Sequence, residues 1–136
     1  MNLEKKEKKT TSKNLKYLLE LKAKIENELR KIIDDMHFLL NKFLSKNPGN
    51  DVESKIFYLK LEADYYRYLA EISLDLENEK ATDLAEQIYN TAYEMSKEIN
   101  LTSPIKLGVA LNLCVFLFEI KNNKDDACRI AKQTLE

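Results

Sequence analysis

The sequence has few residues that interrupt regular secondary structure. Among its 136 residues there are only two glycines and two prolines. Because these residues most often mark turns, sheet-rich folds with many turns are disfavoured. A hydrophobic content of 44% and a charged content of 33% are typical of a soluble, folded chain that favours helices. The sequence therefore predicts an all-α protein.

Histidine and cysteine are also scarce, which limits metal and catalytic sites. The single histidine, His37, follows Asp34 at the i,i+3 spacing of di-iron bundles, but such a site needs a second carboxylate and histidine pair. Cys114 and Cys128 lack zinc-ligand spacing, and we expect buried thiols in a reducing compartment. We find no glycine-rich phosphate loop and no set of nucleophile, base and orienting group. The sequence predicts no catalytic residue, no metal, no cofactor and no enzyme activity.

Neither sign of charge dominates, and no long hydrophobic run is present. With 22 basic and 23 acidic residues the net charge is -1, which gives no overall attraction to nucleic acid or to a membrane. The apolar segment 104–121 is too short to span a bilayer and is interrupted by Lys106 and Asn112. No apolar targeting segment opens the chain, so we expect a cytoplasmic protein.

Residues 1–12 differ in composition from the rest of the chain. They hold one leucine and a run of lysine and glutamate, so we expect a disordered charged tail. A nucleic-acid-binding arm is the alternative, but Glu4 and Glu7 dilute the positive charge. Residues 13–136 are expected to form a single all-helical domain.

Apolar residues recur at three- and four-residue spacing along 13–136, which is typical of amphipathic helices. The strongest break is Asn47–Asn50, and weaker ones fall at 75–80 and 100–103. Because short connections join antiparallel neighbours, we predict an array of about five antiparallel helices. No repeat of about 34 residues is found, which argues against a tetratricopeptide array. The expected helices are 13–46, 52–74, 79–100, 104–121 and 124–136, with candidate caps at Asp51, Asn78, Ser103 and Asn123.

The second expected helix carries two contrasting faces. The core face is predicted to consist of Ile56, Leu59, Ala63, Tyr66 and Ala70. The opposite face is a polar line at i, i+4, i+7, i+8 and i+11, formed by Lys60, Asp64, Arg67, Tyr68 and Glu71. Two cations and a phenol held by carboxylates form a cradle suited to phosphate. The alternative is a solvated face with i,i+4 ion pairs.

A second line of residues lies along the expected helix 104–121. It comprises Gly108, Leu111, Asn112, Val115 and Glu119. A glycine inside a helix is about 1 kcal/mol less favourable than alanine, which indicates that something packs closely there. A carboxamide in an apolar row needs a partner, either another helix or the main chain of a bound peptide.

Two long segments resemble a known family. FYLKLEADYYRYLAE (57–71) and SPIKLGVALNLCVFLFEI (103–120) resemble the 14-3-3 family of phosphoserine- and phosphothreonine-binding adapters. The resemblance implies an all-helical adapter that regulates partner proteins in signalling by holding a phosphorylated peptide in an amphipathic groove. Its expected partners are phosphorylated proteins, with no nucleic acid and no membrane.

The resemblance assigns roles to the polar line. Arg67 and Tyr68 match the pair that binds the phosphate, and Lys60 matches a groove lysine. Asp64 and Glu71 match the acidic residues that orient the basic side chains or bond the peptide.

It also assigns roles to the second line and to the first helix. Asn112 matches the asparagine that holds the peptide main chain, with Glu119 beside it, and the apolar wall is matched by Gly108, Leu111 and Val115. Lys24 and Glu28 fall where family members form salt bridges across a homodimer.

The resemblance covers residues 14–136, the middle of a family member. Nothing here matches the family's three preceding helices, which carry a lysine and an arginine of the phosphate clamp, or its last helix. We therefore expect a groove that is incomplete in this chain. The alternative function is a helical scaffold or interaction module that has lost phosphate recognition.

Overall fold

The computed structural model describes the backbone of residues 2–46 and 51–136, and the side chains of 10–42 and 51–136. Within these residues the backbone forms five helices and no strand, which confirms the all-α prediction. The expected break at Asn47–Asn50 lies outside the described residues. The helices are α1 (Asn2–Lys46), α2 (Val52–Ile72), α3 (Asp75–Ser96), α4 (Pro104–Glu119) and α5 (Lys124–Leu135).

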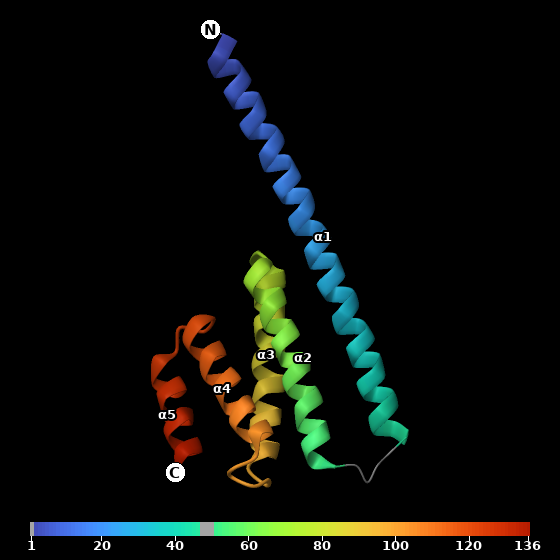
Figure 1. Ribbon diagram of the computed structural model, residues 1–136, viewed down its shortest axis with the longest axis vertical. Helices are drawn as coiled ribbons and strands as arrows, with labels where there is room; N and C mark the ends of the chain where they lie inside the picture. Colours follow the sequence, from blue (N-terminus) through green and yellow to red (C-terminus); the bar gives the residue numbers. More distant parts are fainter. Residues whose placement is uncertain (1, 47–50) are drawn as a thin grey trace.

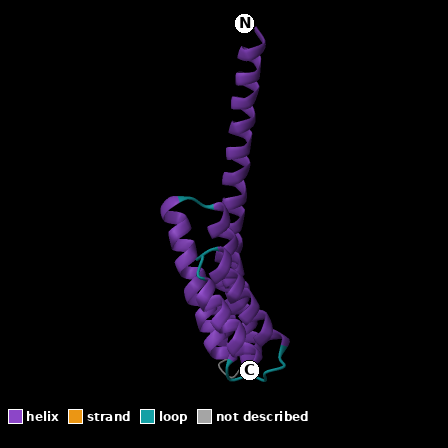
Figure 2. Ribbon diagram, turned by 90° about the vertical axis from the view of Figure 1, so that its left-hand side faces the viewer, coloured by secondary structure: helices purple, strands orange, loops and turns teal. Residues whose placement is uncertain are grey.

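The helices form an antiparallel array with α2 and α3 at its centre (Figure 1). Helix α2 packs against α1, α3 and α4, and α4 packs against α3 and α5. The N-terminal part of α1 projects beyond the other four helices in both ribbon views (Figures 1 and 2).

Helix α1 is longer than expected. It begins at Asn2, so residues 2–12, which were predicted to belong to a disordered tail, are helical. These residues contain no glycine or proline, and lysine and glutamate are strong helix formers. Their lack of apolar residues predicts little packing, and that does not exclude helix.

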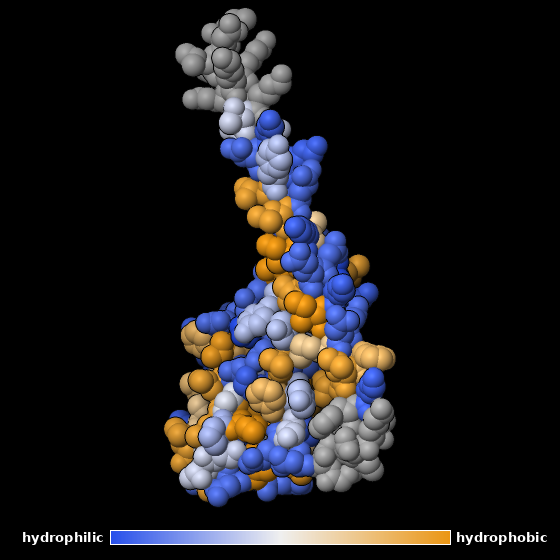
Figure 3. Space-filling view, turned by 45° about the vertical axis from the view of Figure 1, so that its right-hand side comes forward, coloured by the Kyte–Doolittle hydropathy of each residue, from blue (hydrophilic) through white to orange (hydrophobic). Residues whose placement is uncertain are grey.

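Only part of α1 packs on the rest of the protein. Ile33 and Leu40 are buried, whereas Leu15, Leu18 and Leu21 are 57%, 62% and 54% exposed. Figure 3 shows apolar side chains exposed along this helix. Among the described helices, none combines the length and apolar character that a membrane-spanning segment requires.

The main core lies between α2, α3, α4 and α5. The apolar stripe predicted for α2 is confirmed, since Ile56, Ala63 and Ala70 are at most 1% exposed and Leu59 and Tyr66 are partly buried against the core. The facing residues include Ala85, Tyr89 and Ala92 of α3, Val109, Leu113 and Phe116 of α4, and Ala127 and Ile130 of α5.

Two predicted helix caps are confirmed. The carboxylate of Asp51 accepts the backbone N–H of Glu53 at 3.2 Å. The side chain of Asn123 accepts the backbone N–H of Asp126, also at 3.2 Å. Each satisfies a donor in the first turn of its helix, where no backbone acceptor is available.

The other two caps differ from expectation. Ser103 precedes α4 without a side-chain capping bond, and its hydroxyl donates to Glu53 Oε1 at 3.1 Å. Helix α3 begins at Asp75 rather than residue 79, so Asn78 lies inside its first turns. The Asn78 amide instead donates to the carbonyls of Ala70 (2.5 Å) and Ser73 (3.4 Å). Asn78 therefore provides a hydrogen-bond donor for carbonyl groups at the C-terminal end of α2.

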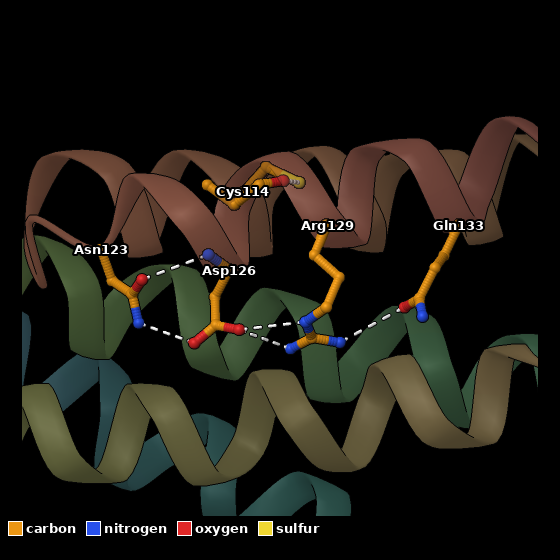
Figure 4. A network of polar contacts seen from close by, with 6 residues as sticks. Cys114, Asn123, Asp126, Arg129 and Gln133 are labelled. Carbon is orange, nitrogen blue, oxygen red and sulfur yellow. Dashed lines mark hydrogen bonds and ion pairs between the residues drawn. The ribbon is translucent and has the colours of Figure 1, made fainter.

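A polar network runs along the outer face of α5 (Figure 4). Asp126 accepts from Asn123 Nδ2 at 2.7 Å and from Arg129 Nη2 at 2.7 Å, and Arg129 Nη1 reaches Gln133 at 3.4 Å. The hydrogen bonds from Arg129, and then from Asn123, hold the pKa of Asp126 below its usual value. The inward face of α5 is short, since Ala127 and Ile130 are buried whereas Ala131 is exposed and Leu135 is 84% exposed.

The expectation of two buried thiols is also corrected. Cys128 is exposed, and Cys114 is half-buried with its Sγ donating to the carbonyl of Ala127 at 3.3 Å. Cys128 of α5 lines an open hollow together with Cys114 and Phe118 of α4.

Candidate functional site

The polar line of α2 forms two ion pairs on one face of the helix. Lys60 Nζ donates to Asp64 Oδ2 at 2.8 Å, and Arg67 Nη1 donates to Glu71 Oε1 at 2.8 Å. The side chains of Lys60 and Arg67 are only 22% and 14% exposed. The i,i+4 pairs of the alternative interpretation are present, but on a face that is partly buried rather than fully solvated.

Asp64 is the centre of this arrangement. It is 5% exposed and receives hydrogen bonds from three helices. Besides Lys60 on its own helix, the donors are the Tyr89 hydroxyl of α3 and Asn112 Nδ2 of α4, the latter at 2.7 Å. The Asp64 carboxylate therefore joins the polar line of α2 to the line on α4.

Arg67 is held on three sides. Its Nε donates to the Tyr89 hydroxyl at 3.4 Å, its Nη1 pairs with Glu71, and its guanidinium lies 4.6 Å from the centre of the Tyr68 ring. Burial acts to lower the pKa of Arg67, but the bond to Tyr89 and the nearby Glu71 and Tyr68 raise it overall. The side chain is a fixed cation.

Tyr89 is the site residue that the sequence analysis missed. Its ring is fully buried and lies 5.4 Å from that of Phe116. Burial, followed by the hydrogen bond to Asp64, raises the pKa of Tyr89 far above its ordinary value, so the hydroxyl stays protonated and donates. The available signal was its position four residues after the buried Ala85. Its neighbour Ile88 is only partly buried.

Gly108 and Asn112 of α4 face the polar line of α2. A Cβ built on Gly108 would lie 3.6 Å from Cε of Lys60, so the lysine stem passes directly over the glycine. This contact is at an ordinary van der Waals distance, so the close packing expected at Gly108 is limited to the lysine stem. Asn112 makes the hydrogen bond to another helix that was one of its two predicted partners.

The rest of the α4 line is more open. Leu111 is 63% exposed, Val115 is half-buried and Glu119 is exposed. Glu119 lines a polar hollow of about 570 Å³ together with Glu71 of α2 and Lys121 after α4. The two lines thus meet twice, at Asp64 with Asn112 and at this hollow.

Three predicted residues make none of these hydrogen bonds among the residues that the structure describes. Tyr68, itself part of the polar line, is 41% exposed and contacts Arg67 through the face of its ring, which also contacts Tyr65 edge to face. Lys24 and Glu28 are exposed on α1 and join neither line. Among the described residues, no group of three or more His, Cys, Asp and Glu side chains is arranged to hold a metal ion.

Comparison with known proteins identifies the family. The model of the family described as 14-3-3 protein matches residues 1–136. The chain belongs to the 14-3-3 family. It is 44% identical to 14-3-3 protein eta of Homo sapiens over 126 residues, which cover 91% of this chain and 51% of that protein.

Other 14-3-3 relatives give similar figures. Identity is 44% over 118 residues with 14-3-3-like protein 2 of Caenorhabditis elegans, covering 86% of this chain and 47% of the relative. It is 41% over 128 residues with human 14-3-3 protein theta, covering 93% and 52%. The chain spans about half the length of the curated relatives that it matches.

Proposed function

We propose that this 14-3-3 chain binds phosphoserine and phosphothreonine peptides as an adapter for signalling proteins, through a groove that is incomplete in this chain. The observation that carries the proposal is the convergence of α2 and α4 on Asp64, which brings the polar line of α2, with Lys60 and Arg67, beside Asn112. In this proposal residues 13–136 act as one domain and need neither a cofactor nor a catalytic residue. The binding partners are cytoplasmic phosphoproteins, and neither nucleic acid nor a membrane is bound.

Arg67 is the phosphate-binding residue in this proposal, with Tyr68 beside it and Lys60 about two turns earlier on α2. A guanidinium has five N–H donors. The Nη2 group of Arg67 makes no hydrogen bond to the residues that the structure describes, whereas Nε and Nη1 are bonded to Tyr89 and Glu71. Hydrogen bonds from a fixed guanidinium to a phosphate are charge-assisted and strong.

Asn112 holds the main chain of the peptide. Its Nδ2 is bonded to Asp64, which fixes the orientation of the amide. The Oδ1 atom makes no hydrogen bond to the residues that the structure describes and can accept a peptide N–H. Leu111, Val115 and Gly108 supply the apolar wall, with Glu119 at its end.

The expected affinity is low. The lysine and arginine that complete the clamp in the family resemblance have no counterpart here. Because hydrogen bonds to charged groups contribute about 1.5 to 3 kcal/mol each, their absence weakens binding by roughly 3 to 6 kcal/mol, about a hundred-fold to ten-thousand-fold.

A scaffold without phosphate recognition is the second candidate. The scaffold is favoured because each cation pairs with a carboxylate, Lys60 with Asp64 and Arg67 with Glu71. The formal charges of the polar line therefore sum to zero.

Titration of the chain with a phosphoserine peptide and its unphosphorylated twin, followed by NMR, distinguishes the two. The adapter predicts tighter binding of the phosphopeptide and loss of that preference in Arg67→Ala. Arg129→Ala, which removes an exposed arginine from α5, is the matched control. Equal binding of the two peptides by the unmodified chain would reject the adapter and support the scaffold.

We also propose a homodimer contact through Lys24 and Glu28 of α1, as the family resemblance implies. Both side chains are exposed and available to a second chain. Sedimentation of the Lys24→Glu variant tests the contact, because a charge reversal weakens a pairing with an acidic partner. An unchanged distribution of monomer and dimer would contradict it.

A further inference from the structure

Asp64 and Arg67 carry opposite charges three residues apart on α2, yet they do not bond to each other. Pairs at this spacing are neighbours on a helix surface and commonly form ion pairs. The bonds of Arg67 go to Tyr89 and Glu71. Those of Asp64 come from Lys60, Tyr89 and Asn112.

The Tyr89 hydroxyl stands between the two charges. It donates to Asp64 Oδ1 and accepts from Arg67 Nε at 3.4 Å. Because the ring is fully buried and packed on Phe116, the oxygen has little freedom to move. The hydroxyl gives each charged group a hydrogen-bond partner that is not the opposite charge.

We propose that Tyr89 is a positioning residue that holds Arg67 away from Asp64, so that the guanidinium remains available to a phosphate. This role rests on the proposed phosphopeptide binding. Tyr89 itself touches no ligand and acts through Arg67.

Removal of the hydroxyl changes the partners of both charges. Asp64 loses one of its donors and Arg67 loses the acceptor of its Nε–H. Direct pairing of Arg67 with Asp64 then replaces the hydrogen bond that each group has lost, since a partly buried charged group that loses a hydrogen-bond partner is unfavourable. That pairing turns the guanidinium inward and partly neutralises it, so a phosphate must compete with Asp64 for it.

The variants Tyr89→Phe, Asp64→Asn and their double mutant test this role through phosphoserine-peptide affinity. We expect Tyr89→Phe to bind about tenfold more weakly, the effect of about one hydrogen bond to a charged group. The double mutant should recover the affinity of Asp64→Asn, because the competing carboxylate is gone. Tyr93→Phe removes a hydroxyl from the same helix that makes no hydrogen bond to the described residues, and should leave affinity unchanged.

A second readout does not depend on peptide binding. In the unmodified chain, the Arg67 Nε–H resonance should show a nuclear Overhauser effect to Tyr89, and in Tyr89→Phe it should shift while circular dichroism stays helical. If the unmodified chain shows no preference for the phosphopeptide, the proposed function fails. The Arg67 Nε–H resonance then still tests whether Tyr89 positions Arg67. A missing Overhauser effect, an unshifted resonance, or a double mutant as weak as Tyr89→Phe would overturn the role of Tyr89.

Discussion

Asn112 on α4 donates a hydrogen bond of 2.7 Å to Asp64 on α2, across 48 residues of sequence. An amide that bonds a buried carboxylate has a structural role whether or not a peptide is bound. The same side chain therefore serves the packing of α2 with α4 and fixes the amide that we propose for peptide binding.

Asn112→Ala should lower the free energy of unfolding by about 1 to 3 kcal/mol, because Asp64 loses a donor and remains buried. Urea denaturation measures the change. Leu111→Ala, at the neighbouring and 63% exposed position, is the control and should change stability by less than about 0.5 kcal/mol. Equal effects of the two substitutions would argue against a structural bond at Asn112.

Gly108→Ala should stabilise the chain by about 0.5 to 1 kcal/mol, since glycine is unfavourable inside a helix. The new Cβ meets only Cε of Lys60, at an ordinary contact distance of 3.6 Å. A larger side chain, as in Gly108→Leu, has to displace the lysine from Asp64 and should cancel the gain. Thermal denaturation of both variants checks this, and a destabilised alanine variant would contradict it.

His37→Ala should destabilise the contact between α1 and α2. The imidazole Nδ1 of His37 lies against Glu62, whose side chain is only 5% exposed. Loss of the histidine leaves a buried carboxylate without this partner, which should lower stability by roughly 1 to 3 kcal/mol. Denaturation measures the loss, and adding Glu62→Gln should restore part of it because an uncharged amide is easier to bury. No recovery in the double mutant would show that the loss has another origin.

Cys128 should react with thiol reagents faster than Cys114. Burial, followed by the proximity of Cys128, raises the pKa of the Cys114 thiol, so less of it is thiolate at mildly alkaline pH. Cys128 is exposed. Mass spectrometry during iodoacetamide labelling checks the order, with Cys128→Ser leaving only the slow site. Faster labelling at Cys114 would contradict the packing of α5 on α4.

The start of α5 should weaken in acid. The pKa of Asp126 is lowered in the folded chain by Arg129 and Asn123, so its contribution is present above the unfolded pKa and is lost as the pH falls through the lowered folded pKa. NMR titration of the Asp126 carboxyl measures that pKa directly. In Asp126→Asn, amide exchange in α5 should be faster at neutral pH and should match the parent chain at the acidic end. A normal pKa for Asp126 would contradict this.

Most of the fold could be predicted from the sequence because its signals are local. The three- and four-residue spacing of apolar side chains fixes which face of α2 is buried, as Ile56 and Ala63 illustrate. The two lines of candidate site residues could be predicted for the same reason, since each lies within one helix. Their meeting at Asp64 depends on how α4 crosses α2, which no local pattern specifies.

Two of the errors arose where distant groups decide the outcome. Tyr89 was missed because its hydroxyl partners lie on another helix, 25 and 22 residues away in the sequence. The Ser103 hydroxyl turns to Glu53, 50 residues away, instead of capping its own helix. Residues 2–12 were predicted as a tail from their lack of apolar surface, although their helix propensity is high.

Asn78 links the two helix ends at the short connection between α2 and α3. Its amide, in the first turns of α3, holds carbonyls at the end of α2. The last turn of one helix therefore cannot fray without loosening the first turns of the other, so this connection opens and closes as a single cooperative unit. In the proposed function, a peptide bound along α2 would therefore also reduce local opening of α3.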